Sequence, residues 1–235
     1  MARLLAIADL HLSGTGDKPM DRFGDLWVGH AERMAENWDR TVGPDDWVLL
    51  PGDLSWGRNL KEAACDLQWI GERPGRKLLL RGNHDSWWGS PGKVRAALPE
   101  SCQILHHDAF RIGRWVVVGA RGWLSPDDPY AVESDRRVFE RELHRLELSV
   151  GDAARLGEPG ERLAMVHYPP CLEGREPTEV VRRLSDAGVS VCVYGHLHGD
   201  DHALAVRGTR EGIRYHFVAA DAIGFCPEVI LDDVE

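Results

Sequence analysis

Short apolar runs alternate along the chain with longer segments in which apolar residues recur every three or four positions. The short runs predict strands at residues 4–8, 47–50, 78–80, 115–119, 163–166, 191–194 and 213–219. The periodic segments predict amphipathic helices within residues 23–38, 60–70, 139–150 and 177–187. Strands that alternate with helices in this way are typical of an α/β domain.

The length and composition favour one domain over residues 1–235. Apolar side chains make up 43% of the chain, which is enough for a substantial core, and no repeat or long linker divides it. No apolar run approaches the roughly 20 residues that a membrane helix requires, so we expect no membrane contact.

The first apolar run and the cysteines both bear on the cellular location. The run is interrupted by Asp9 and His11, and no small-residue cleavage site follows it, so it does not read as a signal peptide. The cysteines are scattered and form no CxxC pair, which suits reduced thiols. We therefore expect a cytoplasmic protein.

The net charge is −10, from 28 basic and 38 acidic residues. An acidic surface repels phosphate backbones, so binding to extended nucleic acid is not expected. This argument concerns the surface, because bound divalent cations can reverse the local charge at a site. The composition does not indicate an oligomeric state.

Polar side chains follow several of the predicted strands at the point where each strand ends. These residues are Asp9 and His11, then Asp53, then Asn83, His84 and Asp85, then His167, and finally His196 and His198. In α/β sheets, ligands bind beyond the carboxyl ends of strands, so these distant segments are expected to build one site. Each Asp or His alone is more simply a capping or loop residue, but independent caps would not recur in this pattern.

The chemistry of this set points to metal ions. Carboxylates, an amide oxygen and imidazoles are oxygen and nitrogen donors without a thiolate, which suits manganese, iron or zinc better than calcium or copper(I). The set exceeds what one tetrahedral zinc uses, but it fits two metals that share a bridging carboxylate. Paired metals of this kind recur in enzymes that displace groups at phosphorus.

The ordered motifs Asp-x-His, Gly-Asp, Gly-Asn-His-Asp, a strand-end His and Gly-His-x-His resemble those of the calcineurin-like metallophosphoesterases. The resemblance covers residues 9–198. It implies an α/β fold with two stacked mixed β-sheets flanked by helices. It also implies hydrolysis of a phosphate ester by in-line attack of a metal-bound hydroxide.

The resemblance also implies a role for each motif residue. The first metal would be held by Asp9, His11 and His198, the bridge would be Asp53, and the second metal would be completed by Asn83, His167 and His196. His84 would face the substrate as general acid, with Asp85 fixing its tautomer.

Five further residues have two possible roles each. Trp56, Trp87 and Trp88 either line the site and bind substrate or pack beneath the loop. Arg121 either clamps a phosphate or forms a salt bridge to the charged helix at residues 140–147. His30 lies on an apolar helical stripe, so a hydrogen-bonded core histidine is favoured over a substrate contact.

Two functions fit these motifs. The first is a phosphoesterase acting on a small phosphomonoester or phosphodiester, with a nucleotide among the candidates. The alternative is a catalytically weak metal-binding scaffold, although the presence of His84 favours an enzyme. The second motif, GDLSWGRN, lacks the Asp-Arg-Gly extension of phosphoprotein phosphatases, which argues against protein dephosphorylation.

Overall fold

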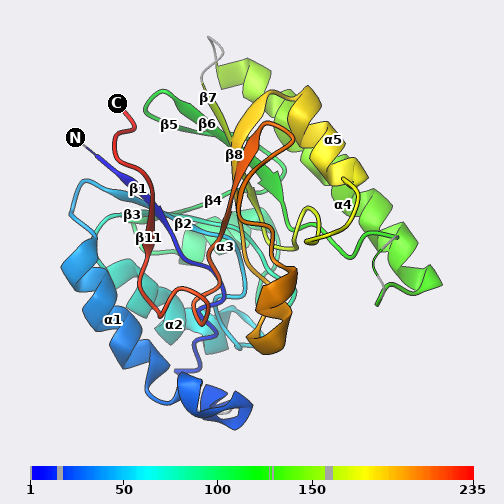
Figure 1. Cartoon of the computed structure of the whole chain (residues 1–235). Helices are drawn as coiled ribbons and strands as arrows, with labels where there is room; N and C mark the ends of the chain where they lie inside the picture. Colours follow the sequence, from blue (N-terminus) through cyan, green and yellow to red (C-terminus); the bar gives the residue numbers. More distant parts are fainter. Residues whose placement is uncertain (1, 15–17, 127, 129, 157–160) are drawn as a thin grey trace.

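The computed structural model describes residues 2–14, 18–126, 128, 130–156 and 161–235. Its strands form two mixed β-sheets that stack face to face, with helices on the outer sides (Figure 1). The predicted α/β sandwich is thus confirmed.

The first sheet has the order β11-β1-β2-β3-β4, formed by Glu228–Leu231, Leu4–Ala6, Trp47–Leu50, Arg76–Leu79 and Cys102–Ile104. The second has the order β5-β6-β7-β8-β10-β9, formed by Phe110–Ile112, Trp115–Ala120, Glu161–Val166, Val189–Tyr194, Ile213–Phe217 and Gly208–Arg210. Strands β1 to β4 run parallel, as do β6, β7, β8 and β10, while β11, β5 and β9 are antiparallel edges.

The strands are buried on both faces. In β1, Leu4 packs with residues of the second sheet in the layer between the sheets, while Leu5 packs with the helices outside the first sheet. In β6, Val117 belongs to the inner layer and Val118 to the outer layer of the second sheet. Near-continuous apolar runs are expected for parallel strands covered on both sides.

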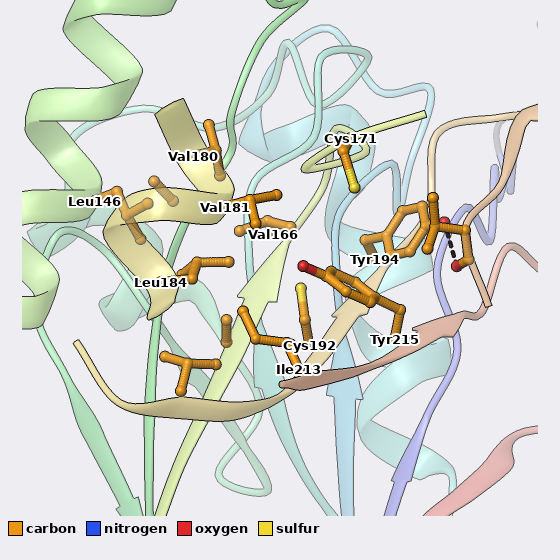
Figure 2. Packing of buried hydrophobic residues seen from close by; sticks show 14 of the residues in the cluster. Leu146, Val166, Cys171, Val180, Val181, Leu184, Cys192, Tyr194, Ile213 and Tyr215 are labelled. Carbon is orange, nitrogen blue, oxygen red and sulfur yellow. Dashed lines mark hydrogen bonds between the residues drawn. The ribbon is translucent and has the colours of Figure 1, made fainter. Parts of the chain in front are cut away.

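The helices divide between the two outer faces. The first sheet is covered by α1 (His30–Thr41), α2 (Leu60–Glu72) and α3 (Pro91–Ala97), and the second by α4 (Glu133–Asp152) and α5 (Glu179–Asp186). Figure 2 shows Leu146 of α4 and Val181 and Leu184 of α5 packed towards the sheet residue Val166. Short 3₁₀ turns occupy Met20–Phe23, Asp25–Trp27, Ala153–Leu156 and Gly199–Leu204. Within the described residues, no helix is long and apolar enough to cross a membrane.

All the predicted strands occur, with ends shifted by a few residues. The short strands β4, β5, β9 and β11 and the helix α3 were not predicted. The prediction that helical periodicity begins at Phe23 is wrong, because α1 begins at His30 and Phe23 is exposed. Gly24 and Gly29 have φ values of 127° and 60°, which interrupt a right-handed helix before that point.

Backbone hydrogen bonds join the carboxyl ends of the two sheets. The N–H of Ala8 donates to Val218 O at 2.8 Å, and Ala8 and Ala219 form a parallel bridge beyond β1 and β10. Within the first sheet, the N–H of Asp9 donates to Gly52 O at 2.9 Å. The segments that carry the strand-end motifs therefore meet at one place.

Candidate metal centre

Four of the predicted ligands have a left-handed backbone conformation. The φ values are 60° for Asp9, 44° for His11, 56° for Asp53 and 78° for His196. This conformation is uncommon for residues other than glycine and costs on the order of 1–3 kcal/mol each. It turns each side chain sharply away from its strand, towards the meeting point of the two sheets.

The side chains of Asp9, His11 and His198 form a first group of donor atoms. Nε2 of His11 lies 3.3 Å from Nε2 of His198, and the latter lies 3.7 Å from Oδ1 of Asp9. Among the described residues, the buried Oδ1 of Asp9 has no hydrogen-bond partner. Burial raises the pKa of Asp9 to about 7. Facing imidazole nitrogens beside an unpaired carboxylate oxygen fit a metal ion.

Asp53, Asn83, His167 and His196 form a second group. Oδ1 of Asn83 lies 2.7 Å from Nε2 of His167 and 3.1 Å from Nδ1 of His196. The other ring nitrogen of His167, Nδ1, donates to Pro51 O at 2.8 Å, so in the neutral ring the lone pair is on Nε2 and is directed into the group. These oxygen and nitrogen donors also fit a metal ion.

Asp53 lies between the two groups. Its Oδ2 is 3.4 Å from Nε2 of His167 in the second group and 3.9 Å from Nε2 of His11 in the first. Burial lowers the pKa of His167, but the charge of Asp53 outweighs this and raises the pKa to about 9. The carboxylate of Asp53 thus creates a local potential that favours a cation, as a bridging ligand must.

Glycines let the backbone approach these carboxylates closely. A Cβ at Gly82 would overlap Oδ1 and the backbone N of Asp53, and a Cβ at Gly195 would overlap Oδ2 of Asp9. The Gly-Asn and Gly-His pairs therefore have a steric cause, since any side chain at the glycine would displace a carboxylate.

Gly82→Ala is expected to displace the Asp53 carboxylate and to lower the metal content of purified protein. Elemental analysis after dialysis measures this. Gly89→Ala is the matched control in the same loop, because a Cβ there meets nothing within 4 Å. Full metal content in Gly82→Ala would show that the loop absorbs the methyl group without moving Asp53.

His84 lies at the edge of the two groups, with its side chain 46% exposed. Its ring packs against Trp56 at a centroid distance of 4.5 Å, and its Nε2 lies 4.0 Å from Oδ2 of Asp53. Its backbone N–H donates to Oδ1 of Asp53 at 2.8 Å. The exposed ring is accessible to a substrate at the centre.

The comparisons with known proteins bear on the family and the fold. A family model for calcineurin-like phosphoesterases matches residues 2–200. The chain belongs to this family. The chain is 40% identical to the gene 66 protein of Mycobacterium phage L5 over 78 residues, which make up 33% of this chain and 37% of that protein. It is 39% identical to the gene 66 protein of Mycobacterium phage D29 over 87 residues, which make up 36% of this chain and 41% of that protein. The chain therefore spans less than half the length of these curated relatives.

Two solved structures share the fold at 16% sequence identity. A protein of unknown function from Aquifex aeolicus has a TM-score of 0.54, with 97% of this chain and 95% of that chain covered. A phosphopantetheinyl hydrolase from Mycobacterium tuberculosis has a TM-score of 0.57, with 99% and 96% covered. At this identity the likeness concerns the fold alone.

In the described part of the chain, no hydrogen bond joins Asp85 to the His84 ring, so its predicted role as the orienting partner is wrong. Its carboxylate accepts hydrogen bonds from the backbone N–H groups of Asp53, Leu54, Ser55 and Gly82 and from the indole of Trp87. The side chain is fully buried. Asp85 instead joins the loop that carries Asp53 to the loop that carries Asn83 and His84.

The three tryptophans near the motifs separate into two kinds. Trp56 lines the centre, stacked on His11 at 4.9 Å and close to His84. Trp87 and Trp88 are buried in the core on the helix side of the first sheet. Their predicted role as substrate-binding walls is therefore wrong, because packing beneath the loop uses both rings.

Arg121 forms the salt bridge that was the alternative to a phosphate clamp. Its guanidinium donates to Oε1 of the buried Glu142 on α4 at 3.0 Å, beside Arg145 at 2.7 Å. The predicted salt bridge is therefore present, while binding of a phosphate by the remaining N–H groups of Arg121 stays a prediction. His30 is a core residue, with ring nitrogens 3.2 Å from Trp27 O and from Leu10 O.

Sequence reasoning missed Asp221, His202 and Lys18. Oδ1 of Asp221 accepts from Nδ1 of His198 at 3.0 Å, which directs the opposite ring nitrogen towards the centre, and His202 lies 3.1 Å from Oδ2. Lys18 places its amine 4.6 Å from the Trp56 ring. A signal for Asp221 existed, because it closely follows the strand Ile213–Phe217, as the predicted ligands follow theirs.

Proposed function

We propose that this member of the family is a dinuclear-metal-dependent phosphoesterase that hydrolyses a small phosphomonoester or phosphodiester. The observation that supports this most is the position of Asp53 between two groups of nitrogen and oxygen donors from five separate strand ends. The first ion would be held by Asp9, His11, Asp53 and His198, and the second by Asp53, Asn83, His167 and His196.

Manganese, iron or zinc ions would supply Lewis acidity, activating water and offsetting charge on the phosphoryl oxygens. Hydrogen bonds within the protein hold the ligand residues of these ions in position. Asp85 holds the Asp53 loop, Asp221 orients His198, and Pro51 O fixes the ring of His167.

His84 is proposed as the general acid. Its ring is exposed at the centre but lies outside both donor groups, so it can face the substrate. As water displaces the ester oxygen from phosphorus, His84 donates a proton to that leaving oxygen and the alcohol departs. Lys18, whose amine lies beside the Trp56 ring, attracts the anionic substrate. A scaffold without turnover would not need this exposed imidazole.

Metal-loaded protein is expected to hydrolyse aryl phosphate esters, and the metal-free protein is not. Purified protein is stripped with a chelator, reloaded separately with manganese, iron or zinc, and assayed with 4-nitrophenyl phosphate and bis(4-nitrophenyl) phosphate. The relative rates then distinguish a monoesterase from a diesterase. Stoichiometric metal binding without turnover of either ester, or of a phosphorylated metabolite library including a phosphopantetheinyl ester, would favour the scaffold function.

A further inference from the structure

A cavity of about 380 Å³ lies beside the candidate metal centre. It is bounded by the segment that follows β6 and by the segment that follows β7, and its lining includes Trp123, Tyr168, Pro169 and Leu172. This volume falls in the range of small-molecule sites, which are mostly apolar with a few polar groups. None of the roles described above uses this cavity.

Tyr168 connects the cavity to the metal centre. It directly follows the predicted ligand His167, and its ring lies 3.9 Å from the ring of His196, centroid to centroid. The Tyr168 ring also lies 4.9 Å from the ring of Trp123, centroid to centroid. A molecule with its phosphate at the centre therefore needs to extend past only one aromatic ring to enter the cavity.

Trp123 is held in place before any ligand binds. Its indole N–H donates to Oδ1 of Asp135 at the start of α4 at 2.8 Å. The guanidinium of Arg121 lies over its ring at 4.6 Å, and Arg121 is itself bound to Glu142. A rigid aromatic wall loses little conformational entropy when a flat ring packs against it.

The polar groups of the lining indicate what kind of ring fits. Its charged residues are Asp128, Arg175 and Glu176, so both hydrogen-bond acceptors and a donor are present and the acidic groups are in excess. The guanidinium of Arg175 makes no hydrogen bond or ion pair with the described part of the chain. Acceptor carboxylates beside an unpaired donor fit a neutral ring that carries both N–H donors and acceptors.

We propose that this cavity binds the organic group of the substrate, and that this group is a planar, nitrogen-containing ring such as a nucleobase. The proposal rests on the proposed function in placing the phosphate at the metal centre. Trp123 then determines specificity by packing against the ring, Tyr168 supports Trp123 from the side of the metal centre, and the cavity edge hydrogen-bonds the ring.

The test compares substrates with and without a ring in the manganese-loaded protein. The monoester pair is each nucleoside 5′-monophosphate against glycerol 3-phosphate, and the diester pair is a dinucleoside monophosphate against glycerophosphocholine. We expect wild-type protein to prefer the nucleotide. Trp123→Ala should lower kcat/KM for the nucleotide by about 5- to 100-fold, the usual loss when a stacking ring is removed, with little change for the ring-free ester.

Two further variants distinguish the loss of ring packing from a general loss of folding or activity. Trp123→Phe keeps a ring and should retain most of the preference. Trp47→Ala removes a partly buried tryptophan at the start of β2, whereas the metal centre lies beyond the other end of that strand. The Arg76 guanidinium lies 5.7 Å from the Trp47 ring. This variant should leave the substrate preference unchanged. An equal loss on both members of a pair in Trp123→Ala, or no preference in wild type, would overturn the proposal.

A binding measurement keeps the cavity testable if no ester is hydrolysed. Nucleosides without phosphate are titrated into the protein while tryptophan fluorescence is followed. Saturable binding that is lost in Trp123→Ala and kept in Trp47→Ala would support the cavity even though the proposed hydrolysis had failed. No binding of any nucleoside, in a protein that also lacks turnover, would overturn it.

Discussion

Asp53→Ala is expected to remove metal from both donor groups at once and to lower phosphoesterase turnover on the order of 10³-fold or more. The carboxylate lies between His11 of the first group and His167 of the second, so this one substitution removes a donor from both groups. Loss of bound metal removes several kcal/mol of charge stabilisation at phosphorus, which corresponds to a rate loss of this size. Metal content by elemental analysis and turnover of an aryl phosphate ester measure the two effects.

Asp46→Ala is the matched control, since it removes a buried carboxylate far from the centre. Asp46 pairs with Arg3 at the start of β2, whereas Asp53 follows the end of that strand. We expect Asp46→Ala to lower the melting temperature and to retain both metals. Two metals at full occupancy in folded Asp53→Ala would show that Asp53 does not bridge.

The strand-end motifs predicted the site because they depend on a general property of parallel strands. Asp9, Asp53 and Asn83 follow strands of one sheet, and His167 and His196 follow strands of the other. Each strand was recognisable as an apolar run, so the positions of the polar residues after it were readable. The stacking of the two sheets came only with the family resemblance, since apolar runs do not indicate which sheet a strand joins.

Contacts between distant loops could not be predicted from the sequence in the same way. Asp85 follows His84 directly, and adjacency suggested that the two side chains interact. The carboxylate instead accepts N–H groups from residues 53–55 of another strand-end loop. Likewise, Trp56 lines the centre and Trp87 is buried, although each lies within three residues of a motif residue. Burial of one ring and exposure of another depend on tertiary packing, not on local sequence.

The edge strands were missed for a different reason. β4, β5 and β9 have three residues each and β11 has four. A run of that length carries too little alternation to be distinguished from a loop. The partner of β11 is β1, at the other end of the chain, so no local pattern indicates that pairing.

His84→Ala is expected to lower turnover of an ester with a poor leaving group on the order of 10²–10⁴-fold, the usual contribution of a positioned general acid. Metal content should stay near that of the wild type, because the His84 ring lies outside both donor groups. A nitrophenyl ester, whose leaving group needs little protonation, should suffer less. The difference between the two losses measures proton donation, and the remaining loss measures electrostatic stabilisation. His144→Ala, at an exposed histidine on α4, is the control.

Asp85→Asn should show a different pattern, because Asp85 supports the Asp53 loop and does not touch the His84 ring. An asparagine turns one acceptor oxygen into an N–H₂ group that faces backbone N–H donors, either those of Asp53 and Gly82 or those of Leu54 and Ser55. We therefore expect a lower melting temperature, weaker metal binding and similar losses on both esters. Loss of one metal in His84→Ala would make His84 a ligand. A loss confined to the poor leaving group in Asp85→Asn would restore Asp85 as the residue that tunes the acid.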